Sequence, residues 1–193
     1  MGGKAIAVEA DITKKSEVTA MAEQAVKQFG AIDILVNNAG IESHPVLTME
    51  LAEESWDRVL NVNLKGSFLC CQAVIPQMMK QNKGRIINIG STASIRIAFF
   101  GGVEYTASKY GQAGLAAHLA WELADSNITV NTVCPGSVSY AADGTGDHAR
   151  VPGNDGQEID SSGTFLHHRR DWRGRELSGE RSRRHDHRPD APR

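Results

Sequence analysis

Short apolar runs alternate with longer stretches of helical period along the first 140 residues of the chain. Residues 5–9, 32–36, 85–89 and 128–133 are rich in Ala, Ile, Val and Leu, and turn-forming residues follow the last three runs. Short runs of this kind predict strands, and apolar character on both faces is typical of central parallel strands. Because the strands alternate with helical segments, the pattern predicts an α/β fold with βαβ units and a parallel sheet.

Three helical segments separate the predicted strands. The first is expected to begin at a cap provided by Thr13 or Ser16 and to end at Gly30. The second covers roughly residues 51–81 and carries apolar side chains near one side. The third begins near Tyr105 and extends to about residue 124. These segments complete the alternation that a parallel sheet requires.

The composition changes abruptly after about residue 140. Every lysine of the chain lies before this point, whereas the remainder has clustered arginines and very few large apolar residues. Such a segment buries too little apolar surface to offset the entropy of ordering it. We therefore expect a partial α/β domain at 1–140 and a disordered tail at 141–193. A reading-frame change near residue 140 would explain the shift.

Charge and cysteine content exclude several function classes. The formal net charge is -2, which gives no electrostatic reason to expect nucleic acid or an anionic membrane as the main partner. No apolar run approaches the roughly 20 residues that span a bilayer. Cys70, Cys71 and Cys134 form no Cys-x-x-Cys pattern, so no metal site is predicted. A reduced, cytoplasmic protein is the expectation.

Tyr105 and Lys109 form the most informative pair of residues in the chain. They are four residues apart at the start of the third helix, which places them on one helical face about one turn apart. A lysine cation beside a phenol favours the phenolate, so Tyr105 could act as a general acid and base. The pair alone is a weak signal, because it occurs by chance on many helices, and it then favours a partly buried tyrosine and a solvated lysine.

Six stretches in a fixed order place this pair in a wider pattern that resembles the short-chain dehydrogenase/reductase family. They are Ala-Asp-Ile-Thr at 10–13, Asn-Asn-Ala-Gly at 37–40, Asn-Val-Asn-Leu-Lys-Gly at 61–66, Ile-Asn-Ile-Gly-Ser at 87–91, Tyr-Thr-Ala-Ser-Lys at 105–109 and Pro-Gly-Ser-Val at 135–138. The resemblance covers about residues 5–139. It implies a Rossmann-like, doubly wound parallel sheet with helices on both faces.

The resemblance also implies catalytic roles for four residues. Tyr105 would exchange a proton with the substrate oxygen, while Lys109 would support the phenolate and hold ribose hydroxyls. Ser91 would donate a hydrogen bond to the reacting oxygen, although Thr92 competes for this role and a plain turn cap is the alternative. Asn63, at a local distortion of its helix, would hold a water that links Lys109 to solvent.

Cofactor contacts follow from the same resemblance, and each has a structural alternative. Asp11 and Ile12 would contact the adenine, but Asp11 could instead stabilise the start of a helix. The stretch formed by Asn37, Asn38, Ala39 and Gly40 would approach the adenosine ribose, although the two asparagines could instead link neighbouring strands. The nicotinamide would be lined by Pro135, Gly136 and Val138. Ser94 stands where the family often has glycine.

Other expected parts of the family pattern are not found in the chain. The first strand that we predict matches the family's third strand, so two strands and the Gly-rich pyrophosphate turn are expected to be missing. The residue that selects NAD or NADP belongs to that missing part, so either cofactor remains possible. The implied function is NAD(P)-dependent interconversion of a small secondary alcohol and a ketone, in a homodimer or homotetramer. The alternative is a catalytically silent fragment.

Overall fold

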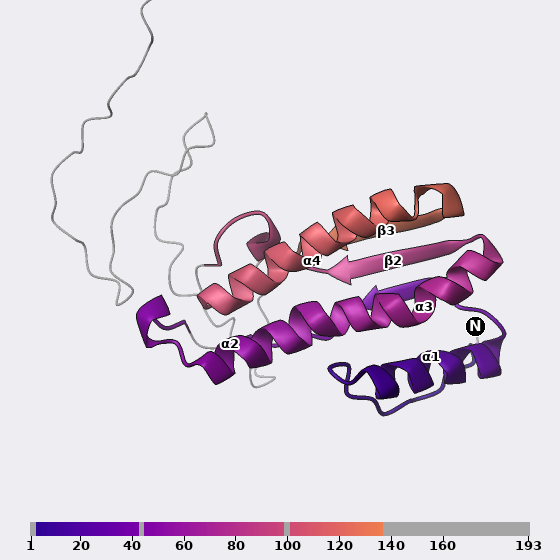
Figure 1. Ribbon diagram of the computed structural model, residues 1–193, viewed down its shortest axis with the longest axis horizontal. Helices are drawn as coiled ribbons and strands as arrows, with labels where there is room; N and C mark the ends of the chain where they lie inside the picture. The colour runs from indigo at the N-terminus through magenta and orange to yellow at the C-terminus, as the bar shows by residue number, and fades with distance from the viewer. Residues whose placement is uncertain (1–2, 43–44, 99–100, 137–193) are drawn as a thin grey trace, which may run out of the picture. The chain divides into compact units, whose positions relative to one another are not determined.

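The computed structural model describes residues 3–42, 45–98 and 101–136, which contain a parallel sheet of three strands. The strands are β1 (Ile34–Asn37), β2 (Gly84–Ile89) and β3 (Ile128–Val133), in the spatial order β1-β2-β3 (Figure 1). Ile34 is paired with Arg85, and Gly84 with Ile128. The parallel α/β class predicted from the sequence is confirmed.

Helices connect the strands, and two of them cover one face of the sheet. The main helices are α1 (Lys15–Phe29), α2 (Glu53–Leu60), the π-helix η2 (Asn61–Gly66), α3 (Ser67–Gln81) and α4 (Val103–Glu122). Single 3-10 turns lie at η1 (Thr48–Glu50), η3 (Thr92–Ser94) and η4 (Ala124–Ser126). Figure 1 shows α3 and α4 lying along the sheet, with α1 beside α3.

The core lies between the sheet and helices α3 and α4. Gly84, Ile86 and Asn88 of β2 are buried, as expected when alternate residues of a strand face the same layer. Ile86 packs in one cluster with Met78 and Cys71, all three fully buried. This packing accounts for the apolar runs that predict the strands, because each supplies side chains to a dry interface with a helix.

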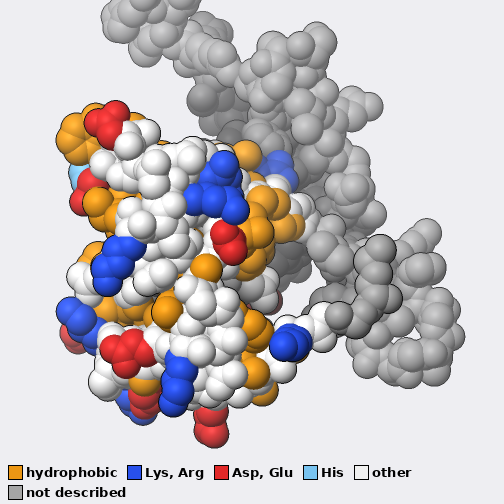
Figure 2. Space-filling model, turned by 90° about the vertical axis from the view of Figure 1, so that its right-hand side faces the viewer, with side chains coloured by type: hydrophobic (Ala, Val, Ile, Leu, Met, Phe, Trp, Pro, Cys, Tyr) orange, Lys and Arg blue, Asp and Glu red, His pale blue; other side chains and the backbone are white. Residues whose placement is uncertain are grey.

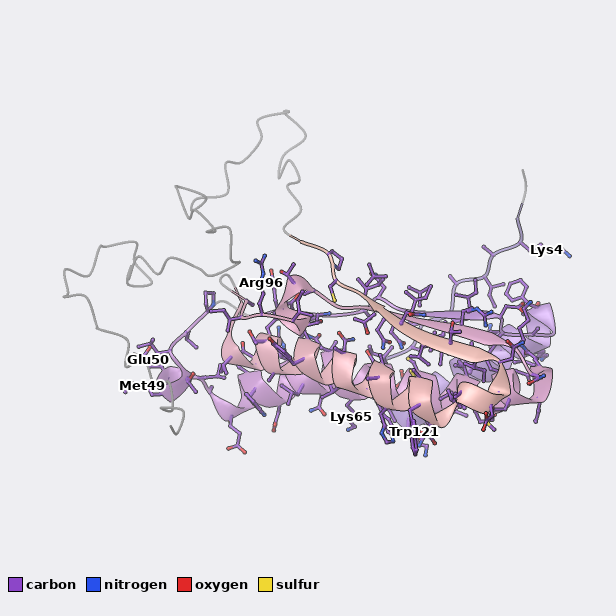
Figure 3. The ribbon with its side chains drawn as sticks, turned by 90° about the horizontal axis from the view of Figure 1, so that it is seen from above. Lys4, Met49, Glu50, Lys65, Arg96 and Trp121 are labelled. Atoms are coloured by element: carbon purple, nitrogen blue, oxygen red, sulfur yellow. The ribbon has the colours of Figure 1, made fainter. Side chains whose placement is uncertain are left out.

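The opposite face of the sheet is exposed. Ile34, Val36 and Val133 have exposed fractions of 60%, 51% and 50%. In Figure 3 the helices lie on one side of the strands, and no helix within residues 3–42, 45–98 and 101–136 lies on the other. The solvent side of α4 is marked in that view by Trp121, which points away from the sheet. The described part of the chain therefore buries one face of the sheet only.

The strand predicted at residues 5–9 is wrong. No secondary structure forms there, and most of these residues are exposed, including Ile6. An isolated extended segment gains no ladder hydrogen bonds, and no strand in the described residues pairs with it.

The capping prediction for α1 is also wrong, because Lys14 is the N-cap and no side chain caps it. Gly30 ends α1 as predicted, in a left-handed conformation with φ of 82°.

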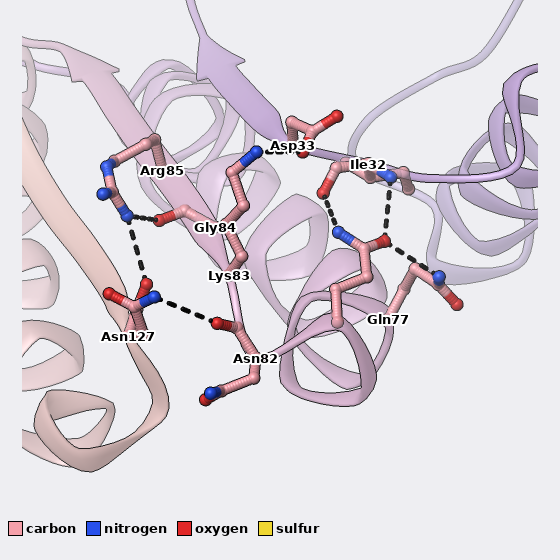
Figure 4. A network of polar contacts seen from close by, with 9 residues as sticks. Ile32, Asp33, Gln77, Asn82, Lys83, Gly84, Arg85 and Asn127 are labelled. Carbon is pink, nitrogen blue, oxygen red and sulfur yellow. Dashed lines mark hydrogen bonds and ion pairs between the residues drawn. The ribbon is translucent and has the colours of Figure 1, made fainter.

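A polar network ties together the amino ends of the strands (Figure 4). Gln81 at the end of α3 accepts a hydrogen bond from the Ile32 N–H at 3.1 Å and donates one to the Ile32 carbonyl at 3.0 Å. Arg85 donates to the carbonyl of Asn127 at 3.1 Å, and Lys83 pairs with Asp33 at 3.1 Å. This end of the sheet is fixed by local contacts, which leaves the carboxyl ends of the strands for chemistry.

The remaining predictions concern the surface and the tail. Figure 2 shows acidic and basic side chains interspersed with hydrophobic ones over one face. Within the described residues, no helix has the length and apolar character needed to cross a membrane. The predictions for residues 141–193 fall outside the described residues.

Candidate active site

The π-helix places Asn63 at the centre of the candidate site. Asn63 is fully buried. Its side-chain Oδ1 accepts a hydrogen bond from the Ile41 N–H at 2.8 Å, and Nδ2 donates to the Ile41 carbonyl at 2.8 Å and to Ser108 Oγ at 3.0 Å. The expected distortion of the helix is therefore present, and Asn63 clamps the loop after β1 onto α4. π-Turns inside α-helices frequently occur at functional sites.

Helix α4 carries Tyr105 and Lys109 on one face. The Lys109 Nζ atom lies 5.7 Å from the centroid of the Tyr105 ring. It donates to the Ile89 carbonyl at 2.9 Å, at the carboxyl end of β2, and to Gln112 Oε1 at 3.1 Å. Lys109 is buried, with an exposed fraction of 5%, whereas Tyr105 is half-buried. The solvated lysine of the alternative interpretation is therefore excluded.

Burial governs the electrostatics of this lysine. Desolvation lowers the pKa of Lys109 below its ordinary value, and the nearby Cys134 sulfur acts in the opposite direction. An ammonium has three donors, and two of those on Lys109 are used by Ile89 and Gln112. The third donor is therefore available to a hydroxyl or oxyanion that enters the site.

Ser91 opens the turn that follows β2. Its Oγ accepts a hydrogen bond from the Ala93 N–H at 3.1 Å, while Ser94 Oγ accepts one from the Ser91 N–H at 3.2 Å. These two bonds form a capping box around η3, so the turn-cap interpretation of Ser91 is confirmed. The hydroxyl hydrogen of Ser91 is not used in these bonds. Thr92 donates its N–H to the Pro135 carbonyl at 3.0 Å, which joins this turn to the segment after β3.

Gly90 allows the turn to pack against β3, and this gives a stability prediction. A Cβ atom at Gly90 would lie 2.6 Å from Ser94 Oγ and 2.7 Å from Thr132 Cγ2. We expect Gly90→Ala to lower the free energy of unfolding by about 1–3 kcal/mol, because overpacking displaces the turn that carries Ser91. Urea unfolding followed by circular dichroism measures this change.

Gly114 offers a matched control on the exposed side of α4. A Cβ atom there meets nothing within 4 Å. Gly114→Ala should raise the free energy of unfolding by about 0.5–1 kcal/mol, since alanine favours a helix more than glycine does. Equal effects of the two substitutions would contradict the close packing of Gly90.

The loop after β1 approaches Lys109 through Gly40. A Cβ atom at Gly40 would lie 3.3 Å from Asn63 Oδ1 and 3.6 Å from Lys109 Nζ. Asn38, Ala39 and Gly40 are exposed, so their backbone is accessible to a ligand. Asn37 behaves differently: it is buried, and its Nδ2 donates to Asn88 Oδ1 on β2 at 2.8 Å. The strand-linking alternative is therefore confirmed for Asn37.

Asp11 and Ile12 are engaged in local contacts. The Asp11 carboxylate accepts hydrogen bonds from Thr13 N at 2.9 Å and Thr13 Oγ1 at 2.8 Å, and these bonds lower its pKa. A Cβ atom at Gly66 would lie 2.6 Å from Ile12 Cδ1, so Ile12 packs against η2. Both residues stabilise the region before α1, and their contact with adenine stays a prediction.

The residues predicted to contact the nicotinamide lie in the segment after β3, and their role stays a prediction. Pro135 and Gly136 are exposed and adjoin the turn that carries Ser91 and Thr92. Val138 lies outside the described residues. The structure thus brings Asn63, Tyr105, Lys109, Gly40 and the Ser91 turn to the carboxyl end of the sheet, where ligands bind in open α/β folds.

Sequence reasoning missed four buried polar residues around this site. Ser67, Ser108 and Gln112 join Asn63 and Lys109 through hydrogen bonds. Glu104 is also fully buried, directly before Tyr105. Helical spacing could have identified two of them, because Ser108 and Gln112 lie near Lys109 on the face of α4 that is otherwise expected to be apolar.

Comparison with known proteins agrees with this geometry. The family profile described as short chain dehydrogenase matches residues 1–148. A 3-oxoacyl-[acyl-carrier-protein] reductase of Staphylococcus epidermidis is 44% identical over 137 residues, which are 71% of this chain and 55% of the relative. A (2S)-[(R)-hydroxy(phenyl)methyl]succinyl-CoA dehydrogenase subunit of Thauera aromatica is 45% identical over 137 residues, 71% of this chain and 54% of the relative.

Solved structures give the same result. A short-chain dehydrogenase/reductase from Burkholderia xenovorans matches with a TM-score of 0.64 and 38% identity, covering 67% of this chain and 51% of the other. The NADP-bound structure of ElxO matches with a TM-score of 0.63 and 33% identity, covering 65% and 50%. The chain thus spans about half the length of the relatives that it matches. It belongs to the short-chain dehydrogenase family.

Proposed function

We propose that the site performs the proton transfer of an NAD(P)-dependent oxidoreductase that interconverts a secondary alcohol and a ketone. The observation that carries this proposal is the buried Lys109, held 5.7 Å from the Tyr105 ring with one donor uncommitted. A tyrosine is one of the side chains that act as general acids and bases, and a neighbouring lysine donor can bind the oxygen that reacts. Tyr105 would thus deliver a proton to a ketone oxygen or remove one from an alcohol.

The residues around Lys109 fit a dinucleotide. The backbone at Gly40 is exposed and lies beside Lys109 Nζ, where a side chain would fill the space. We propose that Asn38, Ala39 and Gly40 receive the adenosine ribose and that Lys109 uses its third donor on the other ribose. Pro135, Gly136 and Val138 would line the nicotinamide, which supplies or accepts the hydride when bound.

Ser91 would orient the substrate. Its hydroxyl hydrogen is free to donate to the reacting oxygen, while its Oγ keeps the bond from the Ala93 N–H. Such a donor stabilises negative charge that develops on that oxygen. Asn63 would contribute by holding the loop at Ile41 against α4, and its proposed water would connect Lys109 to solvent. We propose that Asp11 and Ile12 contact the adenine, since the Asp11 carboxylate is exposed and its hydrogen bonds from Thr13 use only Oδ1.

The relatives indicate a substrate class to test first. One of them is a 3-oxoacyl-[acyl-carrier-protein] reductase. We therefore propose a β-keto thioester as the first substrate to test. Phe68 on α3 and Trp121 on α4 are exposed apolar side chains, which supports self-association as a homodimer or homotetramer through these helices. We also propose that the protein is cytoplasmic.

Cofactor binding tests the proposal directly. NADPH and NADH are titrated separately against the chain, and energy transfer from tryptophan to the nicotinamide is recorded. Trp56 and Trp121 provide described donors. Saturable binding, followed by oxidation of the bound NAD(P)H when acetoacetyl thioester is added, is the expected result. Absence of binding up to millimolar cofactor would contradict the proposal and favour the silent fragment instead.

A further inference from the structure

A set of buried polar residues is joined to Lys109 by hydrogen bonds. Gln112 is fully buried, and Ser67 has an exposed fraction of 2%. Lys109 Nζ donates to Gln112 Oε1 at 3.1 Å, and Gln112 Nε2 donates to Ser67 Oγ at 2.7 Å. Ser67 Oγ then donates to the Asn63 carbonyl at 2.8 Å. These three bonds join α4 to α3 and to the π-helix.

The chemistry of the groups fixes the direction of every bond in this set. An ammonium only donates, so the oxygen of the Gln112 amide must face Lys109. A backbone carbonyl only accepts, so the Ser67 hydroxyl must donate to Asn63 and accept from the Gln112 nitrogen. The amide of Gln112 therefore has one orientation that satisfies both of its partners.

We propose that Gln112, held in place by Ser67, is a positioning residue that fixes the Lys109 ammonium without neutralising it. This inference rests on the proposed function for its catalytic meaning, because Lys109 acts there through its charge and its third donor. Gln112 and Ile89 each take one donor, and so the remaining donor points to the space beside Gly40. A neutral amide does not accept the Lys109 proton, so the hydrogen bond to Gln112 holds the ammonium in place and leaves it charged.

The neutrality of Gln112 matters because of the groups around Lys109. The titratable groups near its Nζ atom are Tyr105 on the same helix and Cys134 after β3. A carboxylate in place of the amide would form an ion pair with Lys109 and offset its positive charge. An apolar side chain would leave one buried donor without a partner, which is costly. Glutamine avoids both outcomes.

Nuclear magnetic resonance of lysine side-chain nitrogens tests the inference. Lys109 is the one buried lysine of the chain, since the other seven are exposed, so its ¹⁵Nζ signal is distinguishable and is assigned with Lys109→Met. The signal is titrated with pH in the chain and in Gln112→Glu and Gln112→Leu. We expect the pKa of Lys109 to rise in Gln112→Glu and to fall in Gln112→Leu. The matched control Gln72→Glu, at an exposed position on α3, should leave it unchanged.

The two substitutions separate positioning from simple loosening of the structure. If Gln112 only fills space, both variants expose Lys109 and move its pKa in the same upward direction, which would overturn the inference. Unchanged titration in both variants would also overturn it. Turnover is measured in parallel, with an expected loss of kcat of about 10- to 100-fold in Gln112→Leu and little change of KM. Since the titration needs neither cofactor nor substrate, its result stands even if the proposed function fails.

Discussion

Replacing Tyr105 with phenylalanine is expected to lower kcat by about 10²- to 10⁴-fold, the usual contribution of a positioned acid or base. The ring contacts remain, including the close approach of Gly101 to Tyr105 Cδ1, so the fold and the affinity for NAD(P)H should be kept. Only the hydroxyl that we propose to exchange the proton is lost. The measurement is the initial rate of NADPH oxidation with a β-keto thioester, together with cofactor titration of the same variant.

Tyr110 supplies the matched control for this experiment. It lies on the same helix, five residues further on, and its ring is exposed. Tyr110→Phe removes an equivalent hydroxyl from solvent, and we expect kcat to stay unchanged. A Tyr105→Phe variant that turned over as fast as Tyr110→Phe would show that another group supplies the proton. Of the two tyrosines in the described residues, Tyr105 is the one whose ring lies under Lys109 Nζ.

Replacing Asn63 with alanine is expected to cause the largest loss of stability around the site. The Ile41 N–H and carbonyl would both lose their partner, and each unpaired buried group costs about 1–3 kcal/mol. A total of about 2–5 kcal/mol is a large part of the stability of a small domain. Chemical denaturation monitored by circular dichroism should show a lower midpoint, and the slope should be retained if the native state stays compact.

The control for this prediction is Asn131→Ala, at an exposed position on β3. Surface substitutions of this kind usually change the free energy of unfolding by less than about 0.5 kcal/mol. Asn63→Asp is a useful third variant, because it keeps the acceptor for the Ile41 N–H but loses the donors to Ile41 and Ser108. We expect it to be at least as destabilising as Asn63→Ala, because a buried carboxylate oxygen would face the Ile41 carbonyl where Nδ2 now donates. Equal stability of Asn63→Ala and Asn131→Ala would mean that the loop is held by other contacts.

The sequence was a good guide to elements whose partners are also in the described chain. The runs at 85–89 and 128–133 become β2 and β3 because they pair with each other and pack under α3 and α4. The run at 5–9 has the same local composition but no partner, and it forms no strand. Strand propensity reflects how well side chains pack on a half-buried sheet surface. It therefore does not produce a strand where there is no neighbouring strand to pair with.

The candidate site shows a similar division. Tyr105 and Lys109 follow from helical spacing, and the structure places both as that spacing requires. Asp11 and Ile12 followed only from the family resemblance, and their contacts are local. Gln112 could not be predicted as a partner of Lys109, because the sequence does not say which side of α4 is covered by α3. Only the packing of the helices in the structure shows that Gln112 is buried away from solvent.

The π-helix has one more consequence, for the two helices on either side of it. Val59 and Ser67 are both buried, although they are eight residues apart. In an uninterrupted α-helix, at about 100° per residue, they would differ in direction by about 80°. One additional residue in the wide turn removes about 100°, which brings the two to within about 20° of each other. Phe68 follows Ser67 directly, so it points about 100° away from it, and its side chain is exposed. One extra residue in the π-helix thus decides which side chains of α3 face the core.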